Sequence, residues 1–286
     1  MSDADTWEPS AREREREAVR RSLRRRSVLV STVTTIVVIG GLVLLTVTSP
    51  GWPRVKALFF SWPDAKAAFP SIWHAFWTYN VKLFLIGEVL ILALALLIAV
   101  VRQSTAPVLL PVRVIAVVYT DLFRGIPTIL LVLMLGFGMP ALGLQGVPTS
   151  LFFWGLVALV LSYGAYVAEV IRAGIESIHP SQIASADALG LSRTQAMRYV
   201  VVPQGIRRVV PPLLNDFISL QKDTALVGVI GVFDALFAAQ DYGNFNFNYT
   251  PYVVVAGYFI VLTVPLARFT DHLQHRAMER ERQGAR

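Results

Sequence analysis

The sequence is poor in the residues on which most catalytic and metal sites depend: its 286 residues include no cysteine and only four histidines. Without cysteine the chain can form no disulfide, no thiolate-ligated metal site and no thiol nucleophile. None of its four lysines ends a glycine-rich phosphate loop, and the HExxH zinc motif is absent. We therefore expect no catalytic residue, no metal ligand and no nucleotide site in this chain.

Long apolar runs are abundant instead. Hydrophobic residues make up 55% of the chain, and runs of about 20 apolar residues recur, which is the length that a helix needs to cross a bilayer. We expect an all-α integral membrane protein with six transmembrane helices. The expected spans are residues 28–48, 81–101, 114–139, 151–171, 212–233 and 252–267.

The basic residues are distributed unevenly between the segments that flank these spans. Twenty of the 26 Lys and Arg residues lie in alternate segments, namely 1–27, 102–113, 172–208 and the tail from Arg268. Only three lie in the intervening segments 49–80, 140–150 and 234–251. Because cytoplasmic loops carry the excess of Lys and Arg, both termini are expected in the cytoplasm. The net charge of +7 is therefore attributed to membrane orientation, and we expect no nucleic-acid partner.

Several polar side chains lie within the expected spans, where lipid cannot solvate them. Ser162, Tyr166, Glu169 and Ala173 are spaced by four, three and four residues, which places them on one face of a helix. Arg172 follows Glu169 by three residues, close enough for an ion pair. These side chains indicate either a polar translocation pathway or polar packing between helices.

Two further spans have polar positions of the same kind. Asn215, Ser219 and Lys222 form a second stripe, and Asp223 adjoins it. In the third span Arg124 lies beside a glycine and near a proline, which permit a kink. The candidate pathway residues are Arg124, Tyr166, Glu169, Asn215, Ser219, Lys222 and Asp223.

The stretch "SADALGLSRTQAMRYVVVP", residues 185–203, lies between the fourth and fifth spans on the expected cytoplasmic side. It is amphipathic and is interrupted by Gly190, which predicts two short helices joined by a glycine. The apolar face of such a unit needs a partner surface.

At this loop the chain resembles the permease subunits of bacterial ABC importers, specifically the polar amino-acid uptake branch. Their loop follows the pattern Glu-Ala-Ala, three residues, Gly, nine residues, Ile-x-Leu-Pro; here nine residues separate Gly190 from the Val-Val-Val-Pro that ends at Pro203. The family's Glu-Ala-Ala falls on Ala184, Ser185 and Ala186, so the acidic residue is absent, although Asp187 is nearby. The resemblance continues through "SYGAYVAEVIRAGIESIHPSQ", "PPLLNDFISLQKDTALVGVIGV" and "YTDLFRGIPTILLV", and covers about residues 80–268.

The resemblance implies a five-helix type I importer core at 81–268, preceded by an extra transmembrane helix. The remaining expected segments are a basic cytoplasmic segment at 1–27, the extra helix at 28–48, an external loop at 49–80 and a cytoplasmic tail at 269–286. The 180–203 loop would couple the chain to a separate ATPase. The coupling residues implied are Ala184, Ser185, Ala186, Asp187, Gly190 and Pro203.

The resemblance also implies the rest of the complex in a bacterial cell membrane. The partners are an ABC ATP-binding subunit that holds ATP and Mg, an extracytoplasmic amino-acid-binding protein, and a second permease subunit in a homodimer or heterodimer. The substrate would be a polar amino acid, and this chain itself would bind no cofactor.

Two other classes of protein are compatible with a polytopic sequence. A secondary amino-acid transporter would carry its own ion-coupling residues and usually an internal repeat, and we find no repeat. A membrane scaffold or sensor would need no polar stripes. The polar stripes and the cytoplasmic loop favour the importer subunit over both alternatives.

Overall fold

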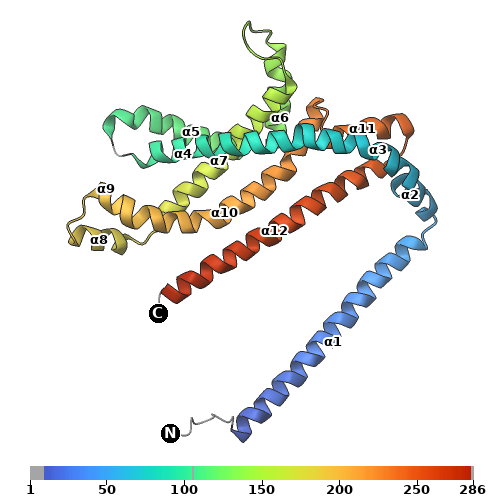
Figure 1. Cartoon of the computed structure of the whole chain (residues 1–286), viewed down its shortest axis with the longest axis horizontal. Helices are drawn as coiled ribbons and strands as arrows, with labels where there is room; N and C mark the ends of the chain where they lie inside the picture. The colour runs from blue at the N-terminus through green and yellow to red at the C-terminus, as the bar shows by residue number, and fades with distance from the viewer. Residues whose placement is uncertain (1–9, 105, 285–286) are drawn as a thin grey trace. The chain divides into compact units, whose positions relative to one another are not determined.

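The computed structural model describes residues 10–104 and 106–284, and every regular element within these ranges is a helix (Figure 1). The all-α fold expected from the apolar runs is therefore confirmed. The chain divides into two compact units, Met1–Ala57 and Leu58–Arg286.

The first unit contains one long helix, α1 (Ala11–Val47). It begins with a capping box, in which the Ser10 hydroxyl accepts from the Glu13 N–H at 3.3 Å and the Glu13 carboxylate accepts from the Ser10 N–H at 2.9 Å. Its apolar part, Leu23–Val47, is long enough to cross a membrane. The sequence predicts a separate basic segment at 1–27. From Ala11 onward, this segment is instead helical and continuous with the apolar part of α1.

The region 49–80, which the sequence predicts as an external loop, covers the end of the first unit and the start of the second. Residues 49–80 are instead mostly helical, in α2 (Trp52–Phe59), α3 (Trp62–Ala75) and the π-helix η1 (Phe76–Asn80), which continues into α4 (Val81–Gln103). Pro63 lies in the first turn of α3, where a proline removes no helical hydrogen bond. The buried side chains of α3 pack with those of α11 and α12. Residues 58–80 therefore belong to the same compact unit as the expected 81–268 core.

The third expected span is broken rather than kinked. After the short 3-10 turn η2 (Pro107–Leu109), helix α5 (Leu110–Gly125) is followed by α6 (Thr128–Ala141) at an angle of 104°. Pro127 disfavours the helical conformation at Ile126, which is extended with φ −95° and ψ 126°. The proline thus explains where the helix ends.

Helix α7 (Leu151–Glu176) is the centre of the second unit. The Ser150 hydroxyl caps its first turn by accepting from the Phe153 N–H at 3.4 Å. It packs against α4, α5, α6 and α10, and Leu159 at its middle is fully buried. Contacts with α7 therefore hold the surrounding helices in place.

The remaining elements form the loop and the last two expected spans. Their bounds are α8 (Pro180–Ala188), α9 (Arg193–Ala196), the π-helix η3 (Met197–Val201), α10 (Val202–Asp223), the 3-10 helix η4 (Thr224–Ile230), α11 (Ala235–Asn246) and α12 (Thr250–Gly284). The fifth expected span, 212–233, thus includes the second half of α10 but not its first half. The expected tail from residue 269 is part of α12. Within residues 10–104 and 106–284, four helices are long and apolar enough to cross a membrane, or up to six if each of two bent pairs counts as one span.

The close approach of α7 and α10 yields a stability prediction. A Cβ at Gly174 would overlap the Val209 Cγ2 atom, so Gly174→Ala should force the helices apart and lower the free energy of unfolding by about 1–3 kcal/mol. Thermal unfolding of the purified protein in detergent measures this change. Adding Val209→Ala should restore stability, and Gly138→Ala, which faces open space on α6, should have no effect. Unchanged stability in Gly174→Ala would contradict the packing.

Candidate functional site

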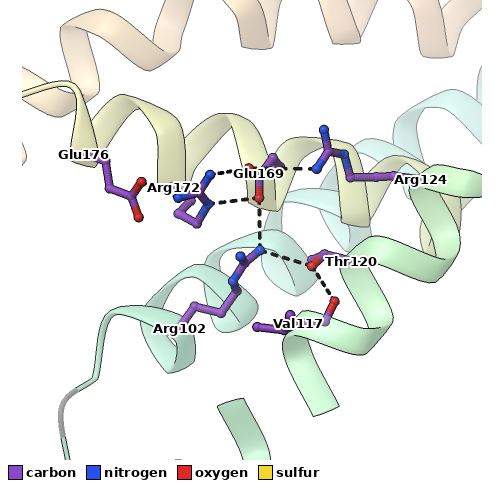
Figure 2. A network of polar contacts seen from close by, with 7 residues as sticks. All are labelled: Arg102, Val117, Thr120, Arg124, Glu169, Arg172 and Glu176. Carbon is purple, nitrogen blue, oxygen red and sulfur yellow. Dashed lines mark hydrogen bonds and ion pairs between the residues drawn. The ribbon is translucent and has the colours of Figure 1, made fainter. Parts of the chain in front are cut away.

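A cluster of charged side chains surrounds Glu169 (Figure 2). One carboxylate oxygen, Oε2, accepts from Arg102 Nη1 and from Arg172 Nε, both at 3.0 Å. The other, Oε1, accepts from Arg172 Nη2 and lies 3.8 Å from Arg124 Nη1. One carboxylate therefore pairs with three guanidinium groups, and we name these residues, with Thr120 and Glu176, the Glu169 cluster.

Three helices supply this cluster. Arg102 is in the last turn of α4, Thr120 and Arg124 lie one turn apart on α5, and the two glutamates with Arg172 lie along one side of α7. Arg102 Nη1 also donates to Thr120 Oγ1 at 3.1 Å, and the buried Thr120 hydroxyl donates to the Val117 carbonyl at 2.9 Å. The Glu169–Arg172 pair expected from the sequence is confirmed, and its neighbours tie α4 and α5 to α7.

Arg124 is the most weakly held cation of the cluster. Its side chain is 39% exposed, compared with 14% for Arg102. The guanidinium lies 6.0 Å from the centre of the Tyr166 ring, and the Tyr166 hydroxyl donates to the Arg124 carbonyl at 3.1 Å. With Glu176 paired to Arg172, the cluster has three positive and two negative charges. This excess charge and the exposed Arg124 are suited to contact an anionic group such as a carboxylate.

The predicted stripe on α10 is separate from this cluster. Asn215 and Lys222 are exposed and Ser219 is partly exposed, whereas Asp223 accepts a hydrogen bond from the Tyr163 hydroxyl at 2.8 Å. Within the described ranges, no hydrogen bond or ion pair connects Asn215, Ser219 or Lys222 to the Glu169 cluster. The sequence-predicted residues thus form two groups, and Asp223 joins α10 to α7.

Sequence reasoning missed a second buried polar group at the start of α4. Asn80 Nδ2 donates to Thr224 Oγ1 at 3.2 Å and to Asp234 Oδ2 at 3.1 Å, while Asn80 Oδ1 accepts from the Ala235 N–H at 3.0 Å. Asp234 also caps α11 by accepting from the Phe237 N–H at 2.8 Å. An aspartate immediately before a helix was the available signal. These contacts hold η1 against η4 and α11.

The loop between α7 and α10 has the helix–glycine–helix geometry that the sequence predicts. Helix α8 ends in a Schellman motif, because the Gly190 N–H donates to the Asp187 carbonyl at 2.9 Å and the Leu191 N–H to the Ala186 carbonyl at 3.1 Å. Gly190 has a φ of +76°, which a residue with a Cβ rarely adopts. A capping box between Ser192 and Gln195 then begins α9.

The loop presents several side chains to the outside. Ala184, Ser185 and Asp187 are exposed, and so is Leu189, at 81%. Ala186 is buried inside the loop, so its side chain is not available to a partner, unlike the other residues of the predicted coupling set. Pro203 is exposed in the first turn of α10, after the π-helix η3. The loop therefore has a preformed bend and an exposed apolar tip at Leu189.

Among the residues that the structure describes, no group of three or more His, Asp or Glu side chains could hold a metal ion.

The sequence is similar to those of two bacterial permeases. The chain is 33% identical over 184 residues to a probable glutamine ABC transporter permease of Bacillus subtilis, and the aligned region covers 64% of this chain and 82% of the relative. It is 32% identical over 200 residues to the arginine transport system permease ArtQ of the same organism, covering 70% and 89%.

Two solved transporter structures are similar to this chain in fold. A crystal structure described as an amino acid ABC transporter with histidines superposes with a TM-score of 0.69 at 29% identity, over 76% of this chain and 98% of that one. The methionine transporter MetNI shares the fold, with a TM-score of 0.56 at 18% identity over 70% and 93%.

A family model covers the broken third span, α7, the loop and α10 to α12. It is the model of the binding-protein-dependent transport system inner membrane component, and it matches residues 108–279. The apolar helices and this match make the chain a multi-pass membrane protein. By these matches the chain belongs to the family of inner membrane components of binding-protein-dependent transport systems.

Proposed function

We propose that this chain is the permease subunit of an ATP-driven importer that carries a polar amino acid into the cell. The observation that carries the proposal is the α8–α9 loop, whose preformed bend and exposed Leu189 suit docking to a separate protein. The glutamine and arginine named in its relatives, and the amino acid transporter among its structural neighbours, support a polar amino acid as the substrate.

The proposal implies three further components of the transporter. Since its lysines form no phosphate loop, ATP and Mg would be bound by a partner ATPase. A second permease subunit would complete the translocation pathway, and an extracytoplasmic binding protein would deliver the amino acid. The excess of Lys and Arg in the segment that contains α8 and α9 supports a cytoplasmic location for this loop and for both termini.

Coupling would act through the exposed side chains of the loop. Leu189 and Tyr199 are both exposed, and burying them on an ATPase would remove apolar surface from water. Ala184, Ser185, Asp187, Gly190 and Pro203 are the proposed coupling residues. When ATP draws the ATPase subunits together, the docked loop would move and carry the start of α10 with it.

The pathway would be lined by exposed and partly exposed polar side chains of α5, α7 and α10. Tyr166 and Arg124 lie at the break between α5 and α6, and Asn215, Ser219 and Lys222 lie along α10. Arg124 would attract the substrate carboxylate, because Glu169, whose Oε1 lies 3.8 Å from Arg124 Nη1, also accepts from two other arginines and neutralises only part of its charge. Glu169 and Asp223 would hold the pathway helices rather than the substrate.

Reconstitution tests the function directly. The purified chain alone should not hydrolyse ATP, whereas vesicles that also contain its ATPase and binding protein should accumulate a radiolabelled polar amino acid when ATP is supplied. A Walker-lysine variant of the ATPase is the control. Uptake that persists with this variant, or that follows an ion gradient without ATP, would contradict the proposal.

Glu169 provides a test of the pathway helices. Glu169→Ala should lower transport at least tenfold while lowering the amount of membrane protein much less, because the spans still insert although Arg102 loses its counter-charge and Arg172 keeps only Glu176. Uptake per molecule of permease, measured by quantitative immunoblotting, separates the two effects. Glu176→Gln is the matched control, since this more exposed carboxylate pairs with Arg172 alone among the residues that the structure describes. Equal losses of uptake and protein would show that Glu169 supports only folding or insertion and does not affect the pathway.

The loop can be tested by the φ angle of its glycine. Gly190→Val should strain the bend by about 1–3 kcal/mol and sharply reduce ATPase co-purification and uptake, while insertion stays normal. Gly190→Asn should retain coupling, because asparagine tolerates a left-handed conformation. Ala184→Glu, which places the family's acidic residue at an exposed position, should be tolerated. Full ATPase recovery and uptake with Gly190→Val would exclude this loop as the coupling element.

A further inference from the structure

A groove lined by aromatic rings lies beside α12, away from the Glu169 cluster. One part is a cavity of about 270 Å³ that is lined by residues of η1, α4, α10 and α12. The next part, of about 390 Å³, is lined by residues of α3, η1 and α12. Phe76, Trp77 and Leu262 line both parts, so the two cavities adjoin. We name the two cavities together the Gln221 groove, after a residue that lines the first of them.

Gln221 presents an unpaired hydrogen-bond donor in this groove. The residue is only 8% exposed. Its Oε1 accepts from the Thr263 hydroxyl at 2.8 Å, whereas its Nε2 is buried and has no hydrogen-bond partner among the residues that the structure describes. The Tyr258 hydroxyl, which lines the adjoining cavity, is likewise buried and unpaired within the described ranges. An unpaired buried N–H group is costly, so this position favours an acceptor atom from outside the chain.

The other polar side chains of the first cavity are already engaged. Asn80 Oδ1 accepts from the Ala235 N–H at 3.0 Å, and Thr224 Oγ1 accepts from Asn80 Nδ2 at 3.2 Å. The rest of the wall consists of Phe, Trp, Leu and Val side chains. Water fits poorly there, because a buried water needs about two to four polar partners. The missing acceptor therefore belongs to a molecule that is mainly apolar.

The surroundings and the size of the groove point to a lipid chain. Trp77, Leu85 and Val261 line it and are exposed, and they lie on helices that are long and apolar enough to cross a membrane. Hydrocarbon is therefore the medium at the mouth of the groove. A helix from another subunit is about 10 Å wide and pairs its own backbone groups, so it neither fits these cavities nor offers a free backbone acceptor.

We propose that the Gln221 groove binds an acyl chain of a membrane phospholipid, whose ester carbonyl accepts a hydrogen bond from Gln221 Nε2. An ester oxygen accepts and has no donor of its own, which matches the unpaired N–H group. The methylene groups of the chain would contact the aromatic and leucine side chains, which otherwise line empty space. The bound lipid would add contacts between α4 and α12, and its binding requires neither the transported solute nor an ATPase.

Ester and ether phospholipids separate the hydrogen bond from the apolar contacts. The full-length chain is purified in detergent, depleted of lipid, and titrated with dioleoylphosphatidylcholine or with its dialkyl ether analogue, and bound lipid is measured by native mass spectrometry. The wild type should bind the diester about fivefold more tightly, because the ether lacks the carbonyl acceptor. Gln221→Leu, which keeps a side chain of similar size, should bind both lipids equally. Equal binding of the two lipids by the wild type would overturn the proposal.

A second variant fills the groove without removing a polar group. Gly257 lines the groove on α12, and a Cβ at this position would have no atom within 4 Å. Gly257→Phe should therefore fold normally, occupy the space of the acyl chain and abolish the preference for the diester. Gly138→Phe, at an equally open position on α6, is the matched control and should bind both lipids as the wild type does. A diester preference that survives in Gly257→Phe would place the lipid elsewhere and contradict the proposal.

The absence of native cysteine allows a check for a protein occupant. Gly257→Cys is oxidised in native membranes and analysed for covalent dimers. We expect no disulfide between two copies of the chain, because lipid fills the groove. Efficient cross-linking would assign the groove to a second permease subunit and overturn the proposal.

Discussion

The pairing of one carboxylate with three guanidinium groups is the interaction on which the centre of this protein depends. Glu169 accepts from Arg102 and Arg172 and lies near Arg124, so a single side chain of α7 holds the ends of α4 and α5. Removing one partner of a buried charge pair is more costly than forming the pair is favourable. Arg102, whose side chain is only 14% exposed, therefore depends most on the ionised Glu169, whereas Arg172 is also paired with Glu176.

The features that the sequence predicts correctly depend on residues that are close together in the chain. Apolar runs predict the spanning helices because hydrocarbon requires every backbone group to be paired within the helix. The Glu169–Arg172 pair and the Gly190 bend follow from spacings of a few residues. Arg102 and Asn80 could not be placed in this way, since their partners Glu169 and Asp234 are 67 and 154 residues away. Those contacts depend on how the helices pack.

The segment before α4 shows a different limit of sequence reasoning. Its tryptophans and prolines resemble a loop at the membrane surface, yet Pro63 is compatible with the first turn of α3 and Pro70 lies inside that helix. Ile72 and Phe76 are buried against α11 and α12. Burial of one apolar face thus outweighs local propensity here, and only the partner helices reveal that face.

The joints between α7 and α10 constrain how the loop can act on the pathway. Gly174 accommodates Val209 near the loop end of this pair, and Tyr163 donates to Asp223 at the other end. Because both ends are joined, displacement of the α8–α9 loop would move α7 and α10 together rather than bend one against the other. Tyr166 on α7 and the polar side chains Asn215, Ser219 and Lys222 on α10 would then shift together. In the proposed importer, a second permease subunit would provide the surface against which these side chains move.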